Sequence, residues 1–76
     1  RTGNWTLQLG AFATPANAAN LRARLARRPE ISGYRLTVTT GARLTSVRAS
    51  GYSASAAHAA CASLQADGFV CVPTGG

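Results

Sequence analysis

Short segments that alternate apolar and polar residues constrain the fold of this 76-residue chain more than any other feature. A two-residue period is typical of β-strands that bury one face. It appears at residues 5–9, 34–39 and 43–49, and we expect a short fourth strand at residues 69–72. Residues 10–13 break the first alternation. Gly41 and Ala42 are expected at the tip of a hairpin between the second and third strands.

The alternation also predicts which side chains each strand buries. The inward sets are Trp5, Leu7 and Leu9, then Tyr34, Leu36 and Val38, then Thr45, Val47 and Ala49. The last strand is open to two interpretations, because either Phe69 and Cys71 or Val70 and Val72 can form its inward pair.

Two segments with helical periodicity separate the strands. Thr14 supplies an N-cap and Pro15 a first helical position, and this first helix is expected to end at Pro29. Ser53 caps a second helix that reaches about Asp67. The predicted inward faces carry Ala18, Leu21 and Leu25 in the first helix and Ala57, Cys61 and Leu64 in the second.

The resulting order, β-α-β-β-α-β, predicts an α+β fold of the ferredoxin-like or RNP-like kind, in which a four-stranded antiparallel sheet carries both helices on one face. We expect one domain at residues 4–73, with tails at 1–3 and 74–76. This length excludes a two-domain enzyme, and because residue 1 is not Met, the chain is expected to be part of a longer protein. The uncovered face would carry Thr6, Gln8, Arg35, Thr37, Thr39, Ser46 and Arg48.

The charge balance predicts an anionic partner. Eight arginines, no lysine and two acids give a net charge of +6. Nucleic acid, anionic lipid and acidic polysaccharide all remain open at this point. Four arginines fall on the first helix, largely off its inward face, and are expected to be solvated or to attract an anionic polymer: Arg22, Arg24, Arg27 and Arg28.

The sequence offers little for catalysis. Glu30 and Asp67 are the two carboxylates and His58 is the single imidazole, with no glycine-rich phosphate loop. Cys61, Cys71 and His58 are too few to fill a structural zinc site. We therefore expect no catalytic residue, no metal and no cofactor. The two cysteines can form one disulfide or remain free thiols.

The uncovered face favours a sugar polymer over RNA. RNA-recognition motifs share this strand order but stack bases on aromatic side chains. The outward residues of the first and third strands include Thr6, Gln8, Ser46 and Arg48, and none is aromatic. Hydroxyl and amide groups suit sugar hydroxyls and acetamido groups, and a guanidinium suits a carboxylate. A single-stranded nucleic-acid-binding domain is kept as the alternative.

The run from Gln8 to Phe12 resembles the opening motif of SPOR domains, the sporulation-related repeat of bacterial cell-envelope proteins. Residues 13–21 continue the match. Residues 47–53 resemble the second SPOR signature in a diverged form, with Gly51 in place of proline and Tyr52 as the aromatic. The resemblance covers residues 4–73, and residues 10–18 are most similar to the rare lipoprotein A group of septal lytic transglycosylases. Other SPOR carriers, including the division protein FtsN and wall amidases, remain open as the parent.

The resemblance implies a non-catalytic periplasmic module that targets a parent protein to the division septum. SPOR domains bind peptidoglycan glycan strands without stem peptides, in which each N-acetylmuramic acid exposes a lactyl carboxylate. It implies no specific nucleic acid, no membrane contact and no cofactor. Phe12 could equally pack in the core, and for Tyr52 core packing is favoured over contact with the glycan. The implied glycan-binding residues are Gln8, Gly10, Ala11, Phe12, Arg35, Thr37, Ser46, Arg48, Ser50, Gly51 and Tyr52.

An envelope location also implies an oxidising compartment, which favours a disulfide between Cys61 and Cys71. Such a bond requires that Phe69 and Cys71 form the inward pair of the last strand. The opposite parity would place Cys71 on the uncovered face.

Overall fold

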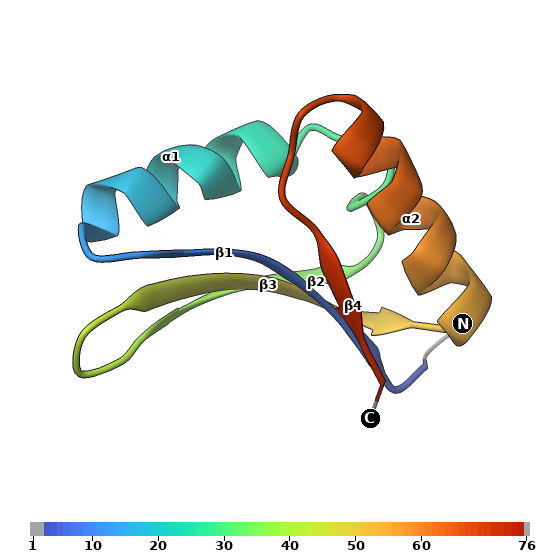
Figure 1. The fold of residues 1–76 in the computed structure, drawn as a ribbon, viewed down its shortest axis with the longest axis horizontal. Coiled ribbons are helices and arrows are strands. Elements are labelled where there is room, and N and C mark those ends of the chain that lie inside the picture. The colour runs from blue at the N-terminus through green and yellow to red at the C-terminus, as the bar shows by residue number, and fades with distance from the viewer. Residues whose placement is uncertain (1–2, 76) are drawn as a thin grey trace.

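The computed structural model describes residues 3–75, which form one antiparallel sheet and two helices (Figure 1). The strands lie in the order β2-β3-β1-β4, and both helices cover the same face of the sheet. The predicted α+β fold is confirmed. No helix in this described range has the length and apolar character to cross a membrane. The elements are β1 (Trp5–Phe12), α1 (Pro15–Leu25), β2 (Arg35–Thr40), β3 (Thr45–Tyr52), α2 (Ala54–Ala66) and β4 (Val72–Thr74).

The core lies between the sheet and the helices, and the predicted inward faces supply most of it. The exception is Val38, which is 38% exposed although it pairs with buried Val47. Because β2 is an edge strand, it has a neighbouring strand on one side only. The buried predicted residues are Leu7, Leu9, Ala18, Leu25, Thr45, Val47, Ala49, Ala57, Cys61 and Leu64.

Residues 10–12 continue β1 instead of ending it. Gln8 pairs with Arg48 and Gly10 with Val47, so Leu9 is an extra residue on the β1 side, a β-bulge. Because of the bulge, the neighbouring residues Leu9 and Gly10 both face the core, whereas successive residues of a regular strand face opposite sides. A Cβ on Gly10 would lie 3.0 Å from Leu21 Cδ2, so glycine at this position lets α1 approach the sheet. The interrupted alternation in the sequence is therefore a bulge within the strand.

A second irregularity lies at the other end of the β1–β3 ladder. The predicted loop at residues 50–52 is in fact the end of β3. Gly51 is the extra residue there, between the pairs Thr6–Ser50 and Trp5–Tyr52, and its φ of 99° is accessible mainly to glycine. The bulge turns Tyr52 into the core, where it is fully buried, stacked on Tyr34.

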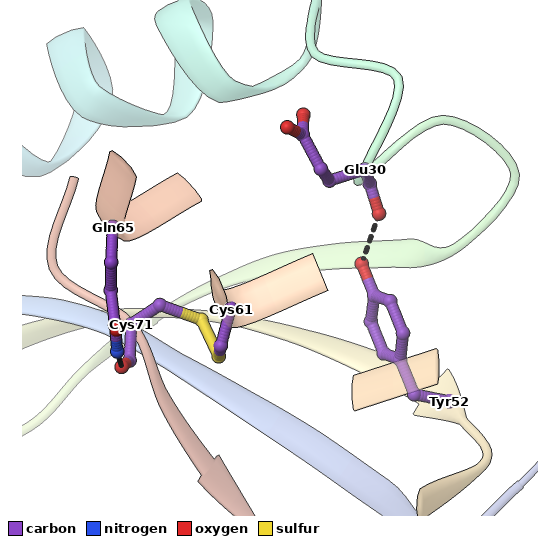
Figure 2. The surroundings of a disulfide bond; sticks show 5 residues. All are labelled: Glu30, Tyr52, Cys61, Gln65 and Cys71. Atoms are coloured by element: carbon purple, nitrogen blue, oxygen red, sulfur yellow. Dashed lines mark hydrogen bonds between the residues drawn. A yellow bond between two sulfur atoms is a disulfide. The ribbon is translucent and has the colours of Figure 1, made fainter. Parts of the chain in front are cut away.

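The last strand begins three residues later than expected, at Val72–Thr74 instead of 69–72. Cys71 is bonded to Cys61 of α2, with the two Cα atoms 5.2 Å apart, and its carbonyl accepts from Gln65 Nε2 at 2.7 Å (Figure 2). The amide of Phe69 donates to the carbonyl of Leu64 in α2. These contacts tie residues 69–71 to α2, so they do not pair with β1. The inward parity of Phe69 and Cys71 and the disulfide are both confirmed.

Helix α2 begins as predicted, since Ser53 Oγ accepts from the amide of Ala56 at 3.2 Å. Helix α1 ends at Leu25, before Pro29, and tight turns carry the chain to β2. Those turns are anchored by buried Ile31 and by the hydroxyl of Tyr52, which donates to the carbonyl of Glu30 at 2.7 Å (Figure 2).

One arginine binds both acidic side chains of the chain. The guanidinium of Arg28 donates to Glu30 through Nε (3.1 Å) and Nη2 (2.8 Å), and it also forms an ion pair with Asp67. Ser63 Oγ of α2 donates to the Glu30 carboxylate as well. This cluster connects the turns after α1 to α2. The hydrogen bonds from Arg28, then that from Ser63, lower the pKa of Glu30 from an ordinary 4.5 to about 2.

The low pKa of Glu30 predicts how stability depends on pH. The folded state holds the carboxylate ionised more strongly than the unfolded chain does, so this contribution is complete above about pH 4.5. It is expected to be lost as the pH falls from 4.5 to about 2. Urea unfolding at a series of pH values measures it. Glu30→Gln should reduce the acid-dependent loss; an unchanged pH profile in that variant would contradict this assignment.

Candidate functional site

The face of the sheet opposite the helices carries rows of polar side chains that cross the strands. Paired residues in an antiparallel sheet point to the same face, so the register defines each row. One row runs from Val72 in β4 through Gln8 and Arg48 to Thr37 in β2. A second row, on one side of it, contains Thr74, Thr6, Ser50 and Arg35, and a third, on the other side, contains Ala11, Ser46 and Thr39. We call this surface the open face.

Gln8 and Arg48 form the direct side-chain contact at the centre of the open face. Arg48 Nε donates to Gln8 Oε1 at 2.8 Å, and the two residues are also cross-strand partners. Arg48 is exposed and Gln8 half-buried. On the other side of Arg48, Thr37 Oγ1 donates to its main-chain carbonyl at 3.4 Å. The bond to Gln8 holds the arginine side chain along the sheet surface.

This arrangement leaves defined groups free for a ligand. Arg48 uses Nε for the bond to Gln8, which leaves its two Nη groups as donors, and a guanidinium can present these to a carboxylate as a pair. The amide nitrogen of Gln8 remains a donor, because the bond to Arg48 uses only its oxygen. The hydroxyls of Thr37, Ser46 and Ser50 lie in the same and neighbouring rows. The surface can therefore bind an anionic, hydroxyl-rich polymer.

The register brings seven of the eleven predicted site residues onto the open face. Gly10 and Phe12 are directed to the helix side, where Phe12 packs against the core. Tyr52 is fully buried by the bulge at Gly51, so its side chain packs in the core, the alternative favoured for it, and does not lie on the open face. Burial also raises the pKa of Tyr52. The seven are Gln8, Ala11, Arg35, Thr37, Ser46, Arg48 and Ser50.

Two open-face residues were missing from both the predicted uncovered face and the predicted site. Val72 lies beside Gln8 and Thr74 beside Thr6, because β4 is formed by residues 72–74. Val72 is 53% exposed. The signal that could have identified it is the parity of the last strand, since an inward Cys71 requires an outward Val72.

The open face carries no aromatic side chain. All five aromatic residues of the chain belong to the core or pack against it: Trp5, Phe12, Tyr34, Tyr52 and Phe69. Bases of a single-stranded nucleic acid would find no ring to stack on at this surface. Nor do the described residues 3–75 contain a group of three or more His, Cys, Asp or Glu side chains that could hold a metal ion.

Comparison with known proteins agrees with this fold. The family model described as the SPOR domain matches residues 2–74. The structure is similar to the solution structure of the peptidoglycan binding domain of the B. subtilis cell wall lytic enzyme CwlC, with a TM-score of 0.73. The two share 24% sequence identity over 97% of this chain and 90% of that chain, a level at which the likeness concerns the fold alone. No curated protein matches the chain.

Proposed function

Because the chain belongs to the SPOR domain family, we propose that its open face binds peptidoglycan glycan strands that lack stem peptides. The observation that carries this proposal is the pair formed by Gln8 and Arg48, in which Arg48 is exposed and uses Nε for the pair, so its two Nη groups remain as donors on a face lined by hydroxyls. The structurally similar domain of CwlC is a peptidoglycan binding domain, which supports the same class of ligand.

The chemistry of the glycan explains a preference for stripped strands. A stem peptide is attached through an amide to the lactyl carboxylate of N-acetylmuramic acid, and its removal exposes that carboxylate. Arg48 can then form a charge-assisted pair, which is worth about 1.5–3 kcal/mol. Gln8 and the row hydroxyls are suited to acetamido and sugar hydroxyl groups. In a peptide-substituted strand the lactyl carboxylate is an uncharged amide, and the bulk of the peptide hinders contact with the sheet surface.

We further propose that this domain localises a parent protein instead of catalysing a reaction. The proposed ligand occurs where stem peptides are removed, at the division septum of the cell envelope. A periplasmic location agrees with the disulfide between Cys61 and Cys71, a bond typical of oxidising compartments. Any wall-cleaving activity would then belong to another domain of the parent.

Sedimentation with purified sacculi tests the proposal. Sacculi treated with an amidase that removes stem peptides are expected to bind the domain about tenfold more tightly than untreated sacculi, since each carboxylate adds a charge-assisted contact. The measurement is the fraction of protein that sediments over a range of sacculus concentrations.

Equal binding to both preparations, or binding to neither, would contradict the proposal. A single-stranded oligonucleotide serves as the competitor. If the oligonucleotide displaced the domain from treated sacculi at low concentration, the alternative of a nucleic-acid-binding domain would be favoured.

A further inference from the structure

The second half of β1 has a strand partner on one edge only. Residues 10–12 pair with β3 at residues 45–47, whereas the pairing with β4 ends at Gln8 and Val72. Within residues 3–75, no backbone hydrogen bond joins residues 10–12 to the loop at 68–70. Figure 1 shows β4 beside the first half of β1 and leaving it before the second half. An unpaired strand edge presents free N–H and C=O groups, a template for another strand.

A groove of about 390 Å³ lies between this edge and the loop at 68–70. Its walls are largely apolar, formed by Phe12 of β1, Leu21 of α1, and Phe69 and Val70 of the loop. Val70 is 65% exposed, so this side of the groove is accessible to a ligand from solvent. Strand edge and apolar groove therefore coincide, which is the combination that binds an extended peptide by β-strand addition.

The charge around the groove is positive. Arg24 lines the groove and lies over the ring of Phe69, 5.1 Å from its centroid. A second hollow of about 380 Å³ shares Arg24 and Phe69 and adds Arg27. Neither is lined by a carboxylate, because the two acids of the chain are bonded to Arg28. The arginines favour a ligand that carries an acidic side chain.

We propose that this groove binds an extended acidic peptide, which adds a strand to β1 at residues 10–12. Its backbone pairs with the free edge, an apolar side chain packs against Phe12 and Leu21, and a carboxylate pairs with Arg24. The rest of this sheet edge is less open to such a strand, because β4 carries Pro73, which has no N–H to donate. The groove is on the helix side of the sheet edge, so a glycan on the open face and this peptide can be bound together.

Nuclear magnetic resonance titration with a defined probe tests the proposal. The blocked hexapeptide Ac-TVTDTV-NH2 alternates side chains so that its valines and the aspartate share a face. We expect amide shifts at residues 10–12 and at the loop 68–70, slower hydrogen exchange at residues 10–12, and about fivefold weaker binding to Arg24→Glu. Arg22→Glu makes the same charge change on α1 outside the groove and should bind as the unchanged chain does.

Three results would overturn the proposal: equal binding of the peptide with lysine in place of aspartate, shifts confined to β2 or the open face, and no shifts up to the solubility of the peptide. Protection of residues 10–12 that rises with protein concentration alone would instead assign the edge to a second copy of the chain. The Arg24→Glu variant is expected to bind amidase-treated sacculi as the unchanged chain does. The peptide proposal can therefore fail while the glycan proposal holds, and the reverse is also possible.

Discussion

The double variant Cys61→Ala/Cys71→Ala is expected to be less stable than the oxidised chain by about 2.5–3 kcal/mol. The bond closes a loop of sequence separation 10, and removing it restores the entropy of that loop to the unfolded chain. In a domain of this size the loss corresponds to a melting temperature lower by roughly 10–20 °C. Urea and thermal unfolding of both proteins measure the effect.

Reduced wild-type protein is the matched control, because it lacks the cross-link but keeps both side chains. Its stability should fall to about the level of the double variant. If the variant alone were destabilised, the cause would be the packing of these two buried residues and not the cross-link. Unchanged stability of both would contradict the prediction.

Arg48→Glu is expected to weaken binding to amidase-treated sacculi by about 10–150-fold, the equivalent of one lost charge-assisted hydrogen bond or more. The new carboxylate also repels the anionic strand. Since Arg48 is exposed and, within residues 3–75, its side chain bonds to Gln8 alone, the fold should be retained. Sedimentation measures binding, and circular dichroism with urea unfolding checks the fold.

Two variants test whether Arg48 acts through a specific contact on the open face or only through the net charge of the domain. Arg22→Glu makes the same charge change on the helix side and should bind treated sacculi within about twofold of wild type, because exposed charges beyond a Debye length are screened. Gln8→Ala keeps the arginine but removes its partner, so an intermediate loss is expected. If Arg48→Glu bound like wild type, the open face would be the wrong site.

The alternation predicted the sheet well because burial of one face is a local property of each strand. It could not predict the register, which fixes the rows of the open face. The contact between Gln8 and Arg48 joins residues 40 positions apart. Alternation placed both outward, but their pairing also depends on the bulge after Gln8. That bulge reflects the close approach of α1 at Gly10, which no local pattern records.

Two other differences have the same origin. Residues 69–71 have the composition of a strand, but the disulfide and Gln65 hold Cys71 against α2. Tyr52 occupies the motif position of a ligand contact, but the extra residue at Gly51 reverses the parity of the strand end and buries it. In each case a tertiary contact overrides a correct local propensity.

The distribution of charge affects the rate at which partners meet the domain. Arg28, Glu30 and Asp67 together carry one net negative charge, whereas the six other arginines within residues 3–75 are all exposed. Their combined field extends beyond contact distance and accelerates the diffusional encounter with a polyanion. Association should therefore slow steeply as salt is added, whereas dissociation, governed by short-range contacts, should change less.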